Sequence, residues 1–245
     1  MDTRCLRKLM MSICFIFTGI GILLIFVVGG NMMSCKASPG GRQSEKIALP
    51  GSHDDSQTSI EQALQQRRSV RTYLNKPLTL TEVSQLLWAA QGINRGREFR
   101  TAPSAGALYP LEVYLVAGNV DGLAEGVYKY RPHQHELLKI IHDDKRRELA
   151  AAALGQRYVQ DGAAVIVIAA VYERTTQKYG QRGIRYVHIE VGHAAQNIYL
   201  QAVSLNIGTV FVGAFDDDEV KRVLNLPDEE HPLSIMPVGK IESYE

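Results

Sequence analysis

An uninterrupted apolar stretch, Ala163–Val171, is the feature of this sequence that most constrains its fold. Only alanine, valine and isoleucine occur in it, and the β-branched residues favour extended chain. A half-exposed strand would alternate apolar and polar positions, so this run predicts a strand that is buried on both faces. We therefore expect a sheet with this strand near its centre and helices flanking the sheet.

The flanking segments predict further helices and strands. Apolar residues at helical spacing predict helices over residues 60–68, 80–91, 143–154, 184–206 and 216–224. Thr79 and Glu82 form a capping-box pattern at the start of the second helix, and Gly92 ends it. Further strands are expected over residues 111–117, 127–130, 137–141 and 233–241. Residues 58–245 therefore predict a single α+β domain with one long central helix.

Charge and cysteine content separate the N-terminal segment from this domain. The chain carries 27 basic and 26 acidic side chains, which gives no overall electrostatic attraction to nucleic acid. All three cysteines lie within the first 35 residues. The predicted domain has no thiol, which excludes a disulfide framework, a cysteine-ligated zinc ion and a cysteine nucleophile there.

Residues 1–35 predict a signal or membrane-anchor segment. Basic side chains precede an apolar run, Leu9–Val28, that is long enough to span a bilayer, and this order favours a domain outside the cytoplasm. Three interpretations stay open: a lipoprotein signal with lipid on Cys35, an uncleaved anchor, and an apolar helix of the domain. Residues 36–57 are rich in serine, glycine and glutamine and predict a flexible tether.

A basic cluster follows the first predicted helix and consists of Arg67, Arg68, Ser69 and Arg71. Guanidinium groups and a hydroxyl this close together bind phosphate through charge-assisted hydrogen bonds. The alternative is a solvated basic helix end, where cations are favourable in any case. Lys240, at the end of the last predicted strand, is a second candidate phosphate contact.

Two loops are built from small residues. Pro103, Ser104 and Gly106 lie in the first loop, and Gly213 lies in the second, which spans residues 208–215. Small side chains let backbone N–H groups approach a flat ligand closely. The alternative in both places is an ordinary connection between elements.

The long predicted helix carries His188, Glu190 and His193, which resemble a zinc-protease helix. Histidines five positions apart lie about 140° apart around a helix, so they do not share the face that zinc binding needs. We expect polar positions on a packed helix and no metal site. The motifs of serine hydrolases, P-loop proteins and dinucleotide-binding folds are absent from the sequence.

In their order along the chain, these blocks resemble the flavin-dependent nitroreductase family, and within it the SagB/ThcOx-type dehydrogenase branch. The resemblance runs from about Ser59 to the C-terminus and is carried by residues 67–73, 103–114, 178–180, 192–197, 208–215 and 237–240. It implies a nitroreductase-like α+β fold with a mixed or antiparallel sheet. It also implies a homodimer that binds FMN non-covalently, in a site between its two subunits.

The resemblance also implies roles for individual residues. The basic cluster would hold the FMN phosphate and ribityl chain, and Lys240 would approach the same phosphate. The flavin ring would be lined by Pro103, Ser104 and Gly106 of the partner subunit and approached by Val212, Gly213 and Ala214. Lys178 and Tyr179 match a pair that removes a proton from substrate in the azoline-oxidising members of the branch.

These predictions lead to three hypotheses of function. The first is an FMN-dependent oxidoreductase that transfers hydride between the flavin and a small organic substrate and takes electrons from a separate donor. The second is a membrane-attached flavin- or ligand-binding lipoprotein without turnover. The third is a dehydrogenase of peptide azolines, which would need partner cyclisation enzymes.

Overall fold

The computed structural model describes residues 45–94 and 99–244. Within these residues, seven strands form one sheet in which every neighbouring pair is antiparallel. Their order across the sheet is β1 (Lys46–Ala48), β6 (Glu136–Ile141), β5 (Gly126–Arg131), β3 (Leu111–Ala117), β7 (Ala164–Ala170), β9 (His231–Lys240) and β8 (Ile207–Thr209). β2 (Leu78–Thr79) and β4 (Val120–Asp121) form a separate parallel pair. The predicted α+β architecture with a mixed or antiparallel sheet is confirmed, and the large sheet is antiparallel.

β7 lies inside the sheet with β3 and β9 on its two sides, and all seven of its residues are buried. Ile166 and Ile168 pack into the core on one face, while Val165 and Val167 pack into the core on the other. Burying an aliphatic side chain of this size contributes roughly 2 kcal/mol. The apolar run therefore stabilises both layers of the fold, as its pattern predicts.

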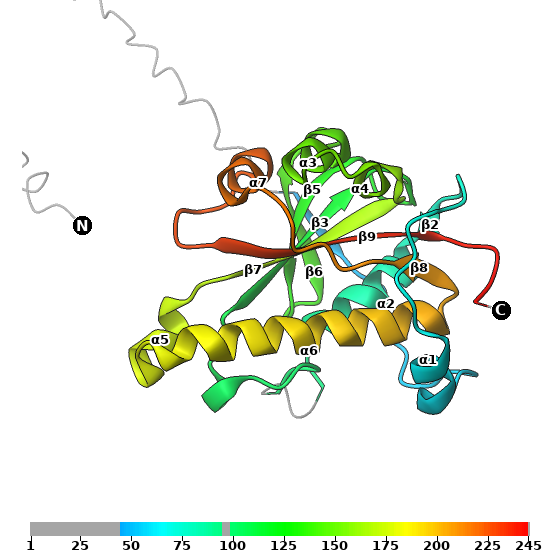
Figure 1. Ribbon diagram of the computed structural model, residues 1–245. Coiled ribbons are helices and arrows are strands. Elements are labelled where there is room, and N and C mark those ends of the chain that lie inside the picture. The colour runs from blue at the N-terminus through cyan, green and yellow to red at the C-terminus, as the bar shows by residue number, and fades with distance from the viewer. Residues whose placement is uncertain (1–44, 95–98, 245) are drawn as a thin grey trace, which may run out of the picture. The chain divides into compact units, whose positions relative to one another are not determined.

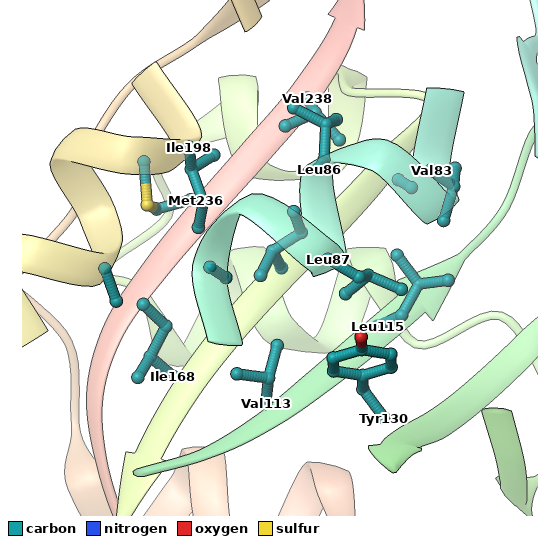
Figure 2. Packing of buried hydrophobic residues seen from close by; sticks show 14 of the residues in the cluster. Val83, Leu86, Leu87, Val113, Leu115, Tyr130, Ile168, Ile198, Met236 and Val238 are labelled. Atoms are coloured by element: carbon teal, nitrogen blue, oxygen red, sulfur yellow. The ribbon is translucent and has the colours of Figure 1, made fainter. Parts of the chain in front are cut away.

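Helices cover both faces of the sheet (Figure 1). One layer contains α2 (Leu80–Gln91) and α6 (Arg182–Ser204), with α1 (Ile60–Gln66) and α5 (Glu173–Tyr179) packed against α6. The other contains α3 (Arg146–Ala152), α4 (Arg157–Asp161) and α7 (Asp217–Leu224). Figure 2 shows the core between the sheet and the layer that contains α2 and α6. Leu86 and Leu87 of α2 lie there with Val113, Ile168 and Ile198.

Local sequence signals fix several helix ends. Thr79 and Glu82 form the predicted capping box at the start of α2. The helix ends at Gly92, where a Cβ atom would lie 2.2 Å from the Trp88 ring, so only glycine fits. A second capping box, which was not predicted, joins Ser59 and Gln62 at the start of α1.

The structure differs from the predictions at the N-terminal side of the domain. Residues 46–48, inside the predicted tether, form β1 and pair with β6. Three residues, Lys46, Ile47 and Ala48, are too few to show the alternating pattern that would predict a strand. In the described part of the chain no helix is long and apolar enough to cross a membrane. The run Leu9–Val28 and Cys35 lie outside the described residues, so their assignments stay predictions.

Candidate functional site

The basic cluster leaves α1 as an extended segment that runs along the end of the sheet. Val70 N–H donates to the Thr209 carbonyl of β8 at 2.8 Å. The Ser69 hydroxyl lies 3.1 Å from the hydroxyl of Tyr199, a residue of α6. The Arg67 guanidinium carbon lies 5.1 Å from the centroid of the same tyrosine ring. Tyr199 therefore joins the cluster to the long helix.

The three arginines of the cluster have different surroundings. Arg68 donates to the carbonyls of Tyr244 and Ser243 at 2.9 and 3.3 Å, so its guanidinium holds the C-terminal segment. Arg71 lies with its guanidinium carbon 5.7 Å from the Tyr158 ring centroid. No ion pair to a carboxylate is found for Arg67 or Arg71 among the described residues. Both guanidinium groups are therefore available to an external anion.

A groove of about 500 Å³ runs along the basic cluster. Residues 68–74 form one wall and residues 241–243 the other. Arg71 also borders a second, polar cavity of about 690 Å³. The exposed side chains of Ser69 and Arg71 thus line a space large enough for a phosphate and the chain that carries it.

Lys240 is directed elsewhere. Its ammonium forms an ion pair with Glu82, the acidic member of the α2 capping box. Its backbone carbonyl accepts from Leu74 N–H at 2.8 Å. A phosphate contact by Lys240 would require it to leave this carboxylate. Its predicted role is untested, and the structure does not group it with Ser69.

The second small-residue loop meets the basic cluster at Tyr199. Phe211 N–H donates to the Tyr199 hydroxyl at 2.7 Å. Val212 exchanges backbone hydrogen bonds with Ile235 of β9 at 2.9 and 3.0 Å, which fixes the segment. Gly213 and Ala214 are exposed, and a Cβ atom at Gly213 would meet only the Phe211 ring, at 3.4 Å. This backbone edge is therefore exposed at the surface.

The first small-residue loop forms a separate cluster with α5. Gly106 has a φ of 63°, and a Cβ atom there would lie 2.7 Å from the Tyr179 hydroxyl and 3.0 Å from Lys178 Nζ. The Ser104 hydroxyl accepts from Tyr109 N–H at 2.9 Å and closes the turn. The predicted pair Lys178 and Tyr179 therefore lies directly against the loop that contains Gly106. Pro103 precedes this turn at an exposed position.

Sequence reasoning missed a buried acid beside this turn. Glu190 is 2% exposed, and burial raises its pKa to about 7, while the Ser104 side chain and the Arg100 charge lower it. His188 and His193 are exposed, so the three residues of the zinc-like pattern do not share one site. The missed signal is that Glu190 follows Val187 by three positions, on the apolar side of the helix.

The two clusters lie at different points along α6. Tyr199 belongs to the basic cluster and Glu190 belongs to the turn, nine residues apart. With a rise of 1.5 Å per residue, the two positions are about 13 Å apart along the helix axis. A single chain thus carries two separate candidate clusters, one with cations and an exposed backbone edge, and one with Lys178 and Tyr179.

Comparison with known proteins identifies the family. The model of the nitroreductase family matches residues 64–240, most of the chain. The chain belongs to the nitroreductase family. A Methanocaldococcus jannaschii protein named as a nitroreductase, MJ1384, is 51% identical over 195 residues, which cover 80% of this chain and 96% of that protein.

Solved nitroreductase structures share the fold. The crystal structure of a Ralstonia eutropha protein named as a nitroreductase has a TM-score of 0.72 and 27% identity, and the match covers 83% of this chain and 92% of that one. The NADPH:FMN oxidoreductase of Vibrio harveyi, solved with NAD⁺, has a TM-score of 0.55 and 21% identity over 76% of this chain and 70% of its own. At that identity the second likeness shows the fold alone. The nitroreductase fold of this chain and its class as an oxidoreductase follow from these matches.

Proposed function

We propose that this nitroreductase is an FMN-dependent oxidoreductase that transfers hydride between the flavin and a small organic substrate. The observation that carries the proposal is the junction at Tyr199. There the basic cluster meets the exposed backbone edge of Gly213 and Ala214. Such a site offers cations to a phosphate and an uncrowded peptide edge to a flat ring.

The residues present fit FMN. Arg67 and Arg71 have no carboxylate partner among the residues described, and Ser69 adds a hydroxyl, so the three would hold the phosphate and ribityl chain. Gly213 and Ala214 would contact the ring edge. When bound, the flavin supplies the hydride chemistry, while the protein supplies orientation and electrostatics. The fold is also that of a protein named for FMN and NADPH, the Vibrio harveyi oxidoreductase.

We propose that two copies of the chain complete each site. Apolar side chains of α1 and α6 are exposed, and Ile189 of α6 has an exposure of 49%. A second copy would cover this face and bring the Gly106 turn of one subunit to the basic cluster of the other. Ile189→Glu is expected to yield monomers and to weaken FMN binding, as measured by sedimentation and by flavin fluorescence.

Within the nitroreductase family, we propose that the chain belongs to the SagB/ThcOx-type dehydrogenases. This assignment is supported by the position of Lys178 and Tyr179 at the end of α5, beside Gly106. In substrate oxidation, one C–H bond would break with its electron pair going to the flavin as hydride. The proton lost from the neighbouring atom would pass to this pair. For reduction of a nitro compound, the same side chains would donate protons instead.

The experiment is a turnover assay on the full-length protein loaded with FMN. NADH and NADPH are offered as donors, with a nitroaromatic compound or a quinone as acceptor. Donor oxidation that depends on both FMN and acceptor supports the proposal. Two results together favour the flavin-binding lipoprotein instead. Neither donor reduces the bound FMN, and the acceptor does not reoxidise FMN that dithionite has reduced. A protein that binds no flavin contradicts both.

We further propose that the N-terminal segment attaches the domain to a membrane, with the domain outside the cytoplasm. Support comes from the basic residues before Leu9–Val28 and from Cys35 as a candidate lipid attachment point. Protease added to spheroplasts should then digest the domain. Protection of the domain until the cells are lysed would contradict this orientation.

A further inference from the structure

Glu190 is a buried acid that the proposed reaction does not use. It lies in the middle of α6 with 2% of its surface exposed, and its Oε1 atom has no hydrogen-bond partner among the described residues. A buried ionised carboxylate without full hydrogen bonding is costly, so burial favours its neutral form. This acid therefore changes its protonation state close to neutral pH.

The group that Glu190 meets on the loop side is the side chain of Ser104. Ser104 begins a turn that its hydroxyl closes by accepting from Tyr109 N–H. Within this turn Ala107 and Tyr109 have φ angles of 53° and 47°, in the left-handed region. Non-glycine residues are strained in this region, so the turn persists only while its surroundings hold it.

Arg100 is the cation that faces Glu190. Its Nη1 donates to Gln91 at 2.8 Å, its Nε has no partner among the described residues, and its guanidinium carbon lies 4.7 Å from the Tyr109 ring centroid. Arg100 therefore connects the buried acid to the far end of the strained turn. An ionised Glu190 would attract this guanidinium away from the tyrosine ring.

The other charged groups near Arg100 are already paired. Arg174 of α5 forms an ion pair with Glu112 of β3 at 2.5 Å, and it donates to the Tyr109 carbonyl at 3.1 Å. These contacts hold Tyr109 from the outside and leave Arg100 as the group that responds to Glu190. On α6 itself, the two histidines near Glu190 are exposed.

We propose that Glu190 is a positioning residue whose protonation holds the Ser104–Tyr109 turn in its flavin-facing conformation. When Glu190 is neutral, Arg100 stays against Tyr109 and the turn is closed. When Glu190 loses its proton, Arg100 moves toward the carboxylate and the turn opens. The inference rests on the proposed function, because that function assigns this turn to the flavin ring.

The direction in which folding stability changes with pH follows from the difference between the pKa of Glu190 in the folded chain and in the unfolded chain. The pKa of Glu190 in the folded chain is raised from 4.5 to about 7. Its proton therefore stabilises the fold at low pH, and that stabilisation is lost as the pH rises from 4.5 through 7. Relative to a neutral side chain, the folding equilibrium constant should fall by roughly 300-fold at most over this range.

The first test measures FMN affinity of the full-length protein at pH 6 and pH 8. If only the neutral form binds, the dissociation constant of the wild type rises about tenfold between these values, because about nine-tenths of Glu190 is then ionised. Glu190→Gln keeps the shape without the charge and should show no such rise. Glu173→Gln removes an exposed acid on α5 and should behave like the wild type.

The second test uses the apoprotein and does not depend on the flavin. The difference in melting temperature between Glu190→Gln and the wild type should grow in favour of the variant from pH 5 to pH 8. Parallel pH profiles for the two proteins, in both affinity and melting temperature, would overturn the proposal. Absence of FMN binding at every pH would instead contradict the proposed function and leave the melting test decisive for Glu190.

Discussion

Gly106 links the strained turn to the candidate catalytic pair, and its replacement by alanine gives the sharpest prediction. Two effects are expected in Gly106→Ala. A side chain at a φ of 63° costs about 1 kcal/mol of folding free energy. The new methyl group would also lie 2.7 Å from the Tyr179 hydroxyl, so that hydroxyl must move.

The loss of turnover depends on which atoms the new methyl group displaces. Both close atoms, Tyr179 Oη and Lys178 Nζ, are the ends of side chains rather than backbone. They can move by a few tenths of an ångström at little cost to stability. A catalytic group displaced by up to an ångström loses as much as about a hundredfold in rate. We expect turnover to fall at least tenfold, with a stability loss close to the backbone cost alone.

Gly122→Ala is the matched control. Gly122 has a φ of 78°, and a Cβ atom there has no neighbour within 4 Å. It should lose the same free energy of unfolding in urea as Gly106→Ala, within about 0.5 kcal/mol, and keep full turnover with FMN, donor and acceptor. Equal turnover in the two variants would refute the reasoning that places Lys178 and Tyr179 in the reaction.

Three further variants test other parts of the structure. Tyr199→Phe leaves Phe211 N–H without its acceptor, which should cost about 1–3 kcal/mol in urea unfolding and weaken FMN binding. Glu230→Gln removes a buried carboxylate that pairs with the partly exposed Lys129 and accepts from the Tyr114 hydroxyl, and should cost about 1–3 kcal/mol. Tyr179→Phe should lower the rate of hydride transfer about a hundredfold in stopped-flow measurements and leave FMN affinity unchanged.

Two of these variants have a control on the same protein. Glu219→Gln breaks an exposed ion pair with Arg222 and should leave the unfolding midpoint unchanged. Tyr186→Phe alters the ring that packs edge-on against Tyr179 at 5.2 Å and should keep the transfer rate. A normal rate in Tyr179→Phe, or equal effects of Glu230→Gln and Glu219→Gln, would contradict these assignments.

Those parts of the fold that local patterns determine were predictable. The run Ala163–Val171 indicates β7, and the capping box at Thr79 locates the start of α2. The apolar spacing from Val187 onward indicates the buried face of α6. In each case the residues that form the element also carry its signal.

Elements that depend on distant partners were not predictable in this way. β1 forms because Ile47 and its neighbours pair with β6, which lies about ninety residues further along the chain. α5 has a polar sequence with Thr175 as its buried residue, and it packs closely against Gly183 at the start of α6. Neither segment has an apolar pattern strong enough to indicate its structure alone.

The residues of the candidate site also divide into those that local sequence predicts and those that depend on distant partners. The motifs located Gly106, Lys178 and Tyr179, which the structure brings together. They did not indicate Tyr199, whose hydroxyl joins two loops from different parts of the chain. For Lys240 the phosphate contact stays a prediction, and the structure pairs its ammonium with Glu82. Such pairings depend on tertiary geometry, which short motifs do not encode.

The central claim is that this nitroreductase binds FMN at its basic cluster. The most direct measurement is the number of FMN molecules released by heat from the purified full-length protein after loading and dialysis. We expect one FMN per chain, and a large loss of binding in the double variant Arg67→Ala, Arg71→Ala with the fold intact. Protein that retains no FMN, or a double variant that retains one per chain, would contradict it.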